Sequence, residues 1–368
     1  MPAAPDHAGP GWGRAVRRLV DQGIISARAA LDGATVVDLV TRSNQLALLS
    51  VDGRPVVAVK RHRSGVTEHD TMATERDAYL AVGRHADRPI APKLLDHGDG
   101  TLTIDAAAGR PLNEVLGVGT DPGEESAILR ALGRTLADLH RLPRDGFSAR
   151  EPWLLGVPDG RAPANLHGDP GLVAFLGDIA DNDTLGPSIR RLRGIWRPLV
   201  PLHGDVKFDN VLVARQTGGP HVTLIDWELA GLGPPAWDLA GVLDGLLLPG
   251  LVAGGVTGAI SRLRFGEAAL DEYRNSTAGS GAVGRPVDGA DLAVAAVARL
   301  AQSAIQLAAM AGEHVDHRRI AADLVAASAE LAKGIVEAPW INSKPGRRSR
   351  SPWTTSIVTA PSLPIPVS

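Results

Sequence analysis

The sequence predicts a two-lobed α+β protein, in which a small antiparallel sheet precedes a larger, mainly helical part. The chain has 368 residues, more than one compact core usually holds. Short apolar or alternating segments fill its first hundred residues, whereas stretches with helical spacing dominate the remainder of the chain. We therefore expect a small lobe over residues 1–105, a larger lobe over 106–340 and a disordered tail over 341–368.

Within the expected small lobe, strands and one helix follow each other in a clear order. Three apolar segments between residues 34 and 62 predict three strands, and Asp52-Gly53 between the last two suits a tight hairpin turn. Residues 67–84 have helical spacing, and two further strands are expected at 93–95 and 101–105. The result is a five-stranded sheet with one helix inserted after its third strand.

The expected large lobe is dominated by helical spacing. Residues 124–141 carry an apolar stripe, and helices are also expected over 237–248, 291–311 and 318–336. Residues 143–200 are rich in Gly, Pro and Asp. We expect them to form an irregular insertion on the substrate side.

Composition excludes several functional classes. The chain has no cysteine, which excludes disulfides, cysteine nucleophiles and thiolate metal sites. Its formal charge of −3 gives no support for nucleic acid as the main partner. The longest apolar run, residues 240–260, contains Asp244, Pro249 and six glycines, which favours a buried helical hairpin over a membrane span. Because the amino terminus also lacks the features of a signal peptide, we expect a cytoplasmic protein without a membrane partner.

The strongest functional signal is the sequence His203-Gly204-Asp205-Val206-Lys207-Phe208-Asp209-Asn210, which precedes an apolar segment typical of a strand. Asp226 ends a second such segment. Phosphoryl transfer requires a carboxylate at the acceptor hydroxyl and oxygen ligands for Mg²⁺. Asn and Asp suit this hard ion better than His does. The pattern supplies both sets of groups on neighbouring loops and therefore predicts phosphoryl transfer.

The stretches HGDVKFDN and IDWELAGLGPPAWDLA make the chain resemble the aminoglycoside phosphotransferase and choline kinase-like family, which has the protein-kinase-like fold. The resemblance extends over about residues 30–337 and implies a kinase that uses ATP and Mg²⁺. It implies that Asp205 is the catalytic base, that His203 is a scaffold residue of the loop, and that Asn210 and Asp226 are metal ligands.

Two further residues gain roles from the same resemblance. Lys207 stands where protein kinases place a lysine against the γ-phosphate, although many relatives lack it. Asp238 resembles a carboxylate that braces the catalytic loop from a following helix.

The nucleotide site is expected in the small lobe. Lys60, at the end of VVAVK, resembles the lysine that pairs with the α- and β-phosphates, and Glu75 is its expected ion-pair partner, with Glu68 in reserve. The loop Thr41-Arg42-Ser43-Asn44 would cover the phosphates, although it lacks the glycines of protein kinases. Asp105, Ala106 and Ala107 would form the hinge that binds the purine.

Three other patterns have simpler explanations. His167-Gly168-Asp169-Pro170 repeats the letters of the motif, but neither metal ligand follows it. We therefore expect this segment to be a loop of the insertion. The tryptophans at 153, 196, 227 and 237 would suit a cationic cage, yet their irregular spacing favours core packing. The acidic residues between 159 and 183 are more typical of solvated surface and lean only slightly towards a basic substrate. They are Asp159, Asp169, Asp178, Asp181 and Asp183.

The expected function is transfer of the γ-phosphoryl group of ATP to a hydroxyl of a small molecule such as an antibiotic, an amino alcohol or a sugar. One alternative is phosphorylation of Ser or Thr in a peptide during natural-product maturation, with a partner lyase that eliminates phosphate. Lys207 gives that alternative weak support, and an open cleft at residues 143–200 would favour it. The other alternative is a kinase-like binding module without catalysis, which failure to bind Mg-ATP would favour.

Overall fold

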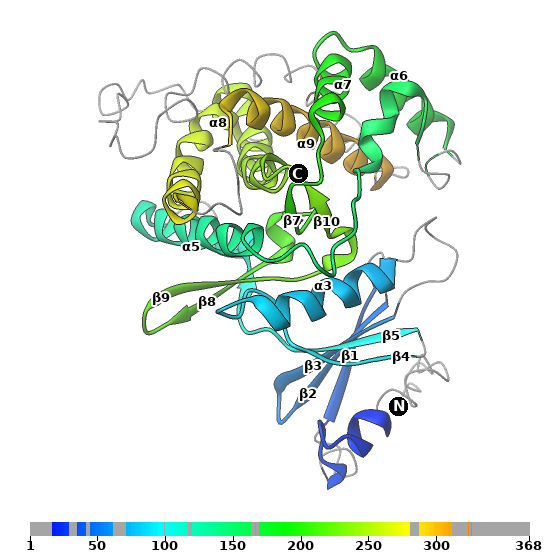
Figure 1. Cartoon of the computed structure of the whole chain (residues 1–368), viewed down its shortest axis with the longest axis vertical. Helices are drawn as coiled ribbons and strands as arrows, with labels where there is room; N and C mark the ends of the chain where they lie inside the picture. The colour runs from blue at the N-terminus through cyan, green and yellow to red at the C-terminus, as the bar shows by residue number, and fades with distance from the viewer. Residues whose placement is uncertain are drawn as a thin grey trace, which may run out of the picture.

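The apolar segments of the first hundred residues form a five-stranded antiparallel sheet in the computed structural model of the chain (Figure 1). The strands are β1 (Thr35–Thr41), β2 (Gln45–Val51), β3 (Arg54–Arg61), β4 (Leu94–Gly98) and β5 (Thr101–Asp105). They lie in the order β1-β2-β3-β5-β4, and every neighbouring pair is antiparallel. Helix α3 (Thr71–His85) follows β3 and lies between the sheet and the rest of the molecule. The predicted sheet with one inserted helix is therefore confirmed.

The structure describes residues 17–28, 35–41, 45–61, 71–98, 100–116, 120–162, 166, 169–279, 287–310, 323 and 325. Several predicted features lie outside these residues. They are loop residues Ser43 and Asn44, the reserve partner Glu68, most of the helix at 318–336 and the tail at 341–368.

Alternation along β3 decides which side chains face the large lobe. Val57 and Val59 are fully buried in a small core with Leu19 and Ile25, on the outer face of the sheet. Because successive side chains of a strand point to opposite faces, Lys60 faces away from this core. The turn before β3 is the predicted hairpin: Asp52 and Gly53 both have positive φ, 51° and 73°, as a two-residue type I′ turn requires.

The larger lobe is mainly helical, so the expected two-lobed α+β architecture is present (Figure 1). Its central helices are α5 (Pro122–His140), α8 (Ala236–Thr277) and α9 (Gly289–Met310). Asp121 caps α5 by accepting a hydrogen bond from the Glu124 amide at 2.9 Å. The buried leucines and alanines of these helices form one continuous core.

The expectation that residues 143–200 are irregular is wrong. This stretch contains a 3₁₀ segment (Trp153–Asp159) and the helices α6 (Pro170–Asp181) and α7 (Leu185–Ile195). Each helix buries three leucine or isoleucine residues at helical spacing, a pattern that the surrounding Gly and Pro residues obscure. Asp169 of the repeated motif letters is the N-cap of α6, because its carboxylate accepts hydrogen bonds from the amides of Gly171 and Leu172.

Helix α8 folds back on itself, as the glycine-rich run predicted. Gly255 has a φ of +60°, and a Cβ atom built on Gly250 would lie only 2.8 Å from the Cα of Ala259. Such an approach between residues nine positions apart is impossible in a straight helix. By length and composition Gly289–Ala309 of α9 is a candidate membrane span, yet 78% of that window is buried in the structure, as in the core helix of a globular protein.

Two small sheets carry the predicted motif. β7 (Val200–Leu202) pairs with β10 (Gly231–Gly233), and β6 (Arg110–Pro111), β8 (Val211–Gln216) and β9 (Gly219–Leu224) form the other sheet. Residues 203–210, which we name the HGD loop, connect β7 to β8. Asp226 follows β9 and precedes a short 3₁₀ segment (Trp227–Leu229). Both motifs therefore lie beside the paired ends of these strands.

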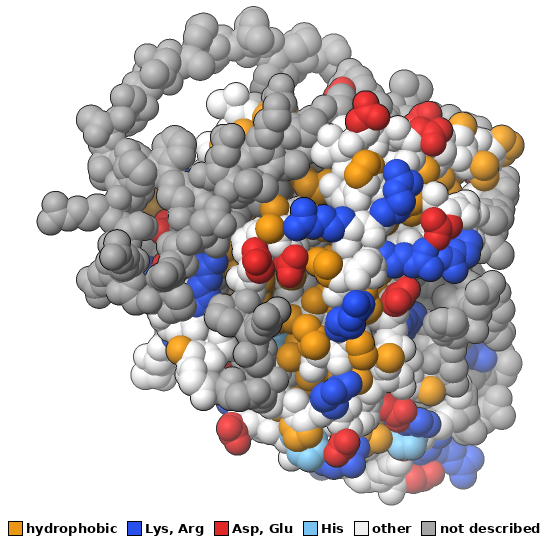
Figure 2. Space-filling view, turned by 45° about the horizontal axis from the view of Figure 1, so that its top comes forward, with side chains coloured by type: hydrophobic (Ala, Val, Ile, Leu, Met, Phe, Trp, Pro, Cys, Tyr) orange, Lys and Arg blue, Asp and Glu red, His pale blue; other side chains and the backbone are white. Residues whose placement is uncertain are grey.

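The outer surface is mixed in charge on the face that Figure 2 shows. Among the residues described there, Arg and Lys side chains are interspersed with Asp, Glu and apolar side chains. Such a mixture is typical of a solvent-exposed protein surface.

Candidate active site

Buried hydrogen bonds and one close backbone approach hold the HGD loop in place. Asp238, on α8, accepts hydrogen bonds from the amides of His203 and Gly204 at 2.8 and 2.9 Å, and His140 lies 3.2 Å from the same carboxylate. Gly204 has a φ of +82°, and a Cβ atom there would collide with the carbonyl oxygen of Leu229. The ring of His203 is completely buried, with Nε2 2.9 Å from the carbonyl oxygen of Ile225. His203 and Asp238 thus lie where a scaffold and a brace are expected.

Asp205 is only 5% exposed and lies among three side chains that favour its charged form. Lys207 Nζ is 3.0 Å from Oδ2, Asn210 Nδ2 donates to Oδ2 at 3.2 Å, and Arg299 lies 3.4 Å from Oδ1. Burial alone would raise the pKa of Asp205, but Lys207 and Arg299 outweigh it and hold this pKa below its ordinary value. The carboxylate is therefore ionised at neutral pH and able to accept a hydroxyl proton.

The two predicted metal ligands lie next to each other. The Ile225 amide donates to the carbonyl oxygen of Asn210 at 3.0 Å, which ties the segment before Asp226 to the HGD loop. Asn210 Nδ2 also donates to the backbone oxygen of Asp205 at 3.1 Å, so its side-chain oxygen is the end directed elsewhere. Asp226 has a φ of 68°, a left-handed conformation that is uncommon outside glycine and concentrates at functional sites.

These ligands fit Mg²⁺ in type and number. Mg²⁺ takes one or two protein oxygens and completes its shell with water and phosphate. Within the described residues no group of three or more His, Cys, Asp or Glu side chains forms a metal site. Asn210 and Asp226 supply hard oxygen donors for such an ion.

Lys60 connects the two lobes through its ion pairs. Its Nζ lies 2.7 Å from Glu75 Oε2 on α3, contacts Asp226 Oδ1, and is 3.6 Å from Glu228 Oε2. Burial would lower the pKa of Lys60, but the three carboxylates outweigh it and raise this pKa above its ordinary value. The predicted pair of Lys60 and Glu75 is thus brought together, and Glu228 joins it.

The predicted hinge offers fewer donors than three consecutive amides suggest. The Asp105 amide donates to the Lys93 carbonyl at 2.9 Å and the Ala106 amide to the Val56 carbonyl at 3.0 Å. Both N–H groups are therefore committed to the sheet. Ala107 is the remaining candidate among the three for an N–H contact with a purine.

Comparison with known proteins agrees with this geometry. The sequence profile described as "Phosphotransferase enzyme family" matches residues 40–273. The chain belongs to this family. It is a phosphotransferase with a hydroxyl acceptor, that is, a kinase. A search of the curated proteins found no sequence match.

Three solved structures illustrate the fold that this phosphotransferase shares. The choline kinase of Cryptosporidium parvum Iowa II has a TM-score of 0.55 at 12% identity, with 88% of this chain and 96% of that chain covered. The ethanolamine kinase of Plasmodium vivax has a TM-score of 0.53 at 11% identity, covering 88% and 89%. The macrolide 2′-phosphotransferase of Brachybacterium faecium has a TM-score of 0.50 at 18% identity, covering 84% and 97%. At these identities the likeness establishes the fold alone.

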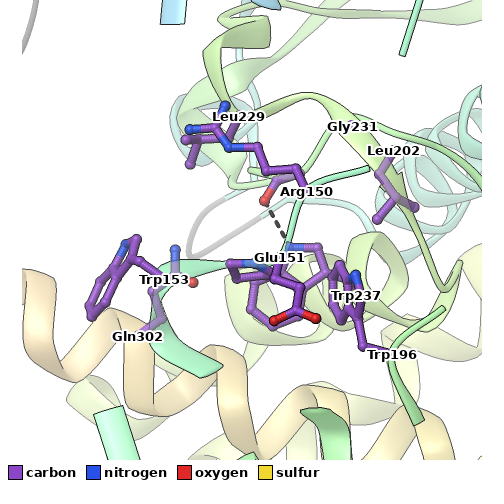
Figure 3. Close-up of a pocket in the computed structure, with 11 residues that line it drawn as sticks. Arg150, Glu151, Trp153, Trp196, Leu202, Leu229, Gly231, Trp237 and Gln302 are labelled. Carbon is purple, nitrogen blue, oxygen red and sulfur yellow. Dashed lines mark hydrogen bonds between the residues drawn. The ribbon is translucent and has the colours of Figure 1, made fainter. Parts of the chain in front are cut away.

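Beside the HGD loop, the phosphotransferase has a small hollow, which we name the aromatic hollow (Figure 3). Its lining includes Glu151, Trp153, Trp196, Gly204, Trp237 and Gln302. Figure 3 shows the Glu151 side chain among the tryptophans of the lining, with Trp153 on one side and Trp196 on the other. Trp196 and Trp237 are edge-to-face with ring centroids 5.7 Å apart, and the Trp237 indole donates to the Gly204 carbonyl at 2.8 Å. The hollow is therefore lined by Gly204, the residue that directly precedes Asp205 in the HGD loop.

The four tryptophans do not share one role. Trp227 is fully buried and packs edge-on against His203 at 4.7 Å, as the core-packing prediction had it. Trp196 and Trp237 are also almost fully buried, but together with Trp153 they line the aromatic hollow. Core packing is thus only part of their role.

Four polar residues of the site were missed by sequence reasoning. They are Glu151, Glu228, Arg299 and Gln302. Arg299 is the one that the sequence could have revealed most easily, because it is the one charged residue in the otherwise uncharged stretch 292–310. An isolated arginine in an apolar helix requires a buried partner. The acidic residues at 159–183 were a poorer guide, since Asp159 pairs with Arg161 and Arg193 and Asp169 caps α6.

Proposed function

We propose that this phosphotransferase transfers the γ-phosphoryl group of ATP, with Mg²⁺, to a hydroxyl of a small molecule that carries an amino group. The observation that carries the proposal is Asp205, a buried and ionised carboxylate that directly follows Gly204 of the hollow lining and lies beside Lys207 and Asn210. Of the acceptor classes considered, amino alcohols and amine-bearing antibiotics fit the lining better than neutral sugars.

The aromatic hollow has the composition of a site for a cation. Tryptophan faces attract positive charge, and Glu151 provides the carboxylate. Gln302 is 3% exposed, and its Oε1 has no hydrogen-bond partner among the described residues, so a donor group of the acceptor would satisfy it. Arg150 also lines the hollow, but its guanidinium donates to the Glu228 carbonyl at 2.7 Å.

In the proposed reaction Asp205 accepts the proton of the acceptor hydroxyl. The hydroxyl oxygen forms a bond to the γ-phosphorus as the bond between that phosphorus and the β–γ bridging oxygen breaks, and ADP leaves. Lys60 and Lys207 would stabilise the negative charge of the phosphates. Mg²⁺, held by Asn210 and Asp226, would supply further charge neutralisation. Such catalysis depends mainly on positioning and electrostatics.

The two alternatives receive less support. A peptide acceptor would be favoured by an open cleft over residues 143–200, but this stretch contains helices and contributes Glu151, Trp153 and Trp196 to the aromatic hollow. A binding module without catalysis does not require Lys60, Asp205, Asn210 and Asp226 together.

A panel of acceptors tests the proposal. ADP formation is measured with Mg-ATP and aminoglycosides, amino alcohols, neutral sugars or Ser/Thr-rich peptides. Turnover is expected with amine-bearing alcohols and is expected to fall at least about 100-fold in Asp205→Ala, while Mg-ATP binding persists. Glu151→Gln should raise KM several-fold for amines but not for neutral alcohols. Normal turnover in Asp205→Ala, or turnover with peptides alone, would contradict the proposal.

A further inference from the structure

Asp205 contacts Arg299, a cation that lies outside the HGD loop and far from it in the sequence. Arg299 lies on α9, 94 residues after Asp205, and is only 3% exposed. Both of its terminal nitrogens are 3.4 Å from Asp205 Oδ1, and Nη2 is also 3.4 Å from the Val206 carbonyl. One guanidinium thus contacts both the side chain of Asp205 and the backbone that follows it.

The guanidinium is itself held from two sides. Its Cζ lies 5.2 Å from the centre of the Trp237 ring, over its face. Asp244, on α8, is a second buried carboxylate close enough to interact electrostatically with Arg299, and Ser303, one helical turn after Arg299, donates to Asp244 at 2.6 Å. Residues of α8 and α9 therefore surround the Arg299 guanidinium.

This cluster is poorly built for stability alone. Three buried side-chain polar atoms of this cluster, one each on Asp244, Arg299 and Gln302, lack a hydrogen-bond partner among the described residues. Buried ionic groups with unsatisfied atoms cost stability, and apolar residues would pack here at lower cost. Their concentration around Asp205 and the aromatic hollow points to a functional reason.

Lys207 and Arg299 differ in a way that separates their roles. Lys207 has a side chain that is 38% exposed and belongs to the HGD loop itself. Under the proposed function it would turn towards the γ-phosphate, and its contact with Asp205 would then weaken. Arg299 is buried, and residues of α8 and α9 surround its planar guanidinium. We therefore expect it to stay at Oδ1 during the reaction.

We propose that Arg299 is a positioning residue for the transfer reaction, which holds Asp205 Oδ1 and thereby orients Oδ2, the oxygen beside Lys207 and Asn210, for the acceptor hydroxyl. This inference rests on the proposed function. It makes α9 part of the active site although the sequence motifs lie elsewhere, because one turn of the helix carries Arg299 to Asp205 and Gln302 to the hollow.

Kinetics of Arg299 variants test the inference in the full chain. With Mg-ATP and the best acceptor of the panel, Arg299→Gln should lower kcat roughly 100-fold and leave KM for ATP and acceptor within about threefold, because misplacement of a reacting group acts on the transition state. Arg299→Lys should restore part of kcat, and millimolar guanidinium should partly rescue Arg299→Ala. Arg262→Gln is the matched control, since Arg262 pairs with the buried Glu125 at 2.7 Å and should keep kcat within twofold.

A folding defect is separated by a second variant. Arg299→Gln combined with Asp244→Asn removes both buried charges together, so it should fold, bind Mg-ATP and still have the low kcat. A normal kcat in either folded variant, or a loss confined to KM, would overturn the inference. Absence of turnover in the wild-type protein with every acceptor would instead overturn the proposed function, and this inference with it.

Discussion

At the scale of single residues, Lys60 shows how one charge organises the nucleotide side of the site. It is 9% exposed, yet it stays protonated because Glu75, Asp226 and Glu228 surround it. The pKa of Lys60 is raised, so its stabilising contribution is complete below the ordinary lysine pKa of 10.5 and is lost only as the pH rises through the higher folded value. Across neutral pH, this ion-pair network is therefore constant.

Replacing Lys60 by Met should damage both stability and nucleotide binding. The change removes the ion pair between Lys60 and Glu75, which is 1% exposed, and breaking such a buried pair costs about 3 kcal/mol. Urea denaturation should show this loss, and the KM for ATP should rise more than tenfold. Lys93→Met is the control, because the Lys93 side chain is exposed and should tolerate the change. Equal ATP affinity in the two variants would refute a role for Lys60 at the phosphates.

At the scale of elements, α8 decides the position of the HGD loop. Asp238 holds the loop by hydrogen bonds, and glycines further along α8 let the helix approach its backbone. A Cβ atom on Gly241 would collide with the Val206 carbonyl oxygen and lie 3.1 Å from Val206 Cβ. Because Val206 follows Asp205 directly in the sequence, the packing of α8 against Val206 also affects the position of Asp205.

Gly241→Ala should therefore reduce both stability and kcat. Overpacking of this kind costs about 1–3 kcal/mol, and the required shift displaces the loop that carries Asp205. Gly177→Ala in α6 is the matched control, because no atom lies within 4 Å of its Cβ position and alanine favours a helix by about 0.5–1 kcal/mol. Thermal unfolding and kcat per folded molecule measure both. A Gly241→Ala enzyme as active as Gly177→Ala would refute the link.

The pH dependence of stability reports on the contact between α8 and α9. Burial raises the pKa of Asp244 to about 6, against the opposing effects of Arg299 and Ser303. A folded pKa above the unfolded 3.8 means that the native state binds the proton more tightly, so stability falls as the pH rises from about 4 to about 6. Asp244→Asn removes this penalty. The difference in unfolding free energy between Asp244→Asn and wild type, measured in denaturant titrations, should rise by roughly 3 kcal/mol from pH 4 to pH 7. A difference that stays constant with pH would contradict the raised pKa of Asp244.

The elements also show what the sequence could and could not predict. The sheet of the small lobe follows from local signals, namely alternation along the strands and the Asp52-Gly53 turn. Residues Asp205, Asn210 and Asp226 lie close in sequence to the strands that position them. Their proximity could therefore also be predicted from the sequence. The contact of Arg299 with Asp205 spans 94 residues and depends on how α9 packs against α8, which no local pattern encodes.

At the scale of the whole molecule, the two lobes meet at the site. Lys60 belongs to the sheet of the small lobe, whereas Asp226 and Glu228 belong to the large lobe, so their ion pairs cross between them. The aromatic hollow is lined by Gly204 of the HGD loop and by residues of β7, β10, α8, α9 and the stretch before α6.

The most direct test of this account follows the phosphoryl group itself. ATP labelled at its γ-phosphate is incubated with Mg²⁺, wild-type protein and an amine-bearing alcohol, with Asp205→Ala as control. We expect the label on the acceptor hydroxyl, no transfer once Mg²⁺ is chelated, and at least about 100-fold less transfer by the variant. Label found only as inorganic phosphate, or equal transfer by Asp205→Ala, would contradict it.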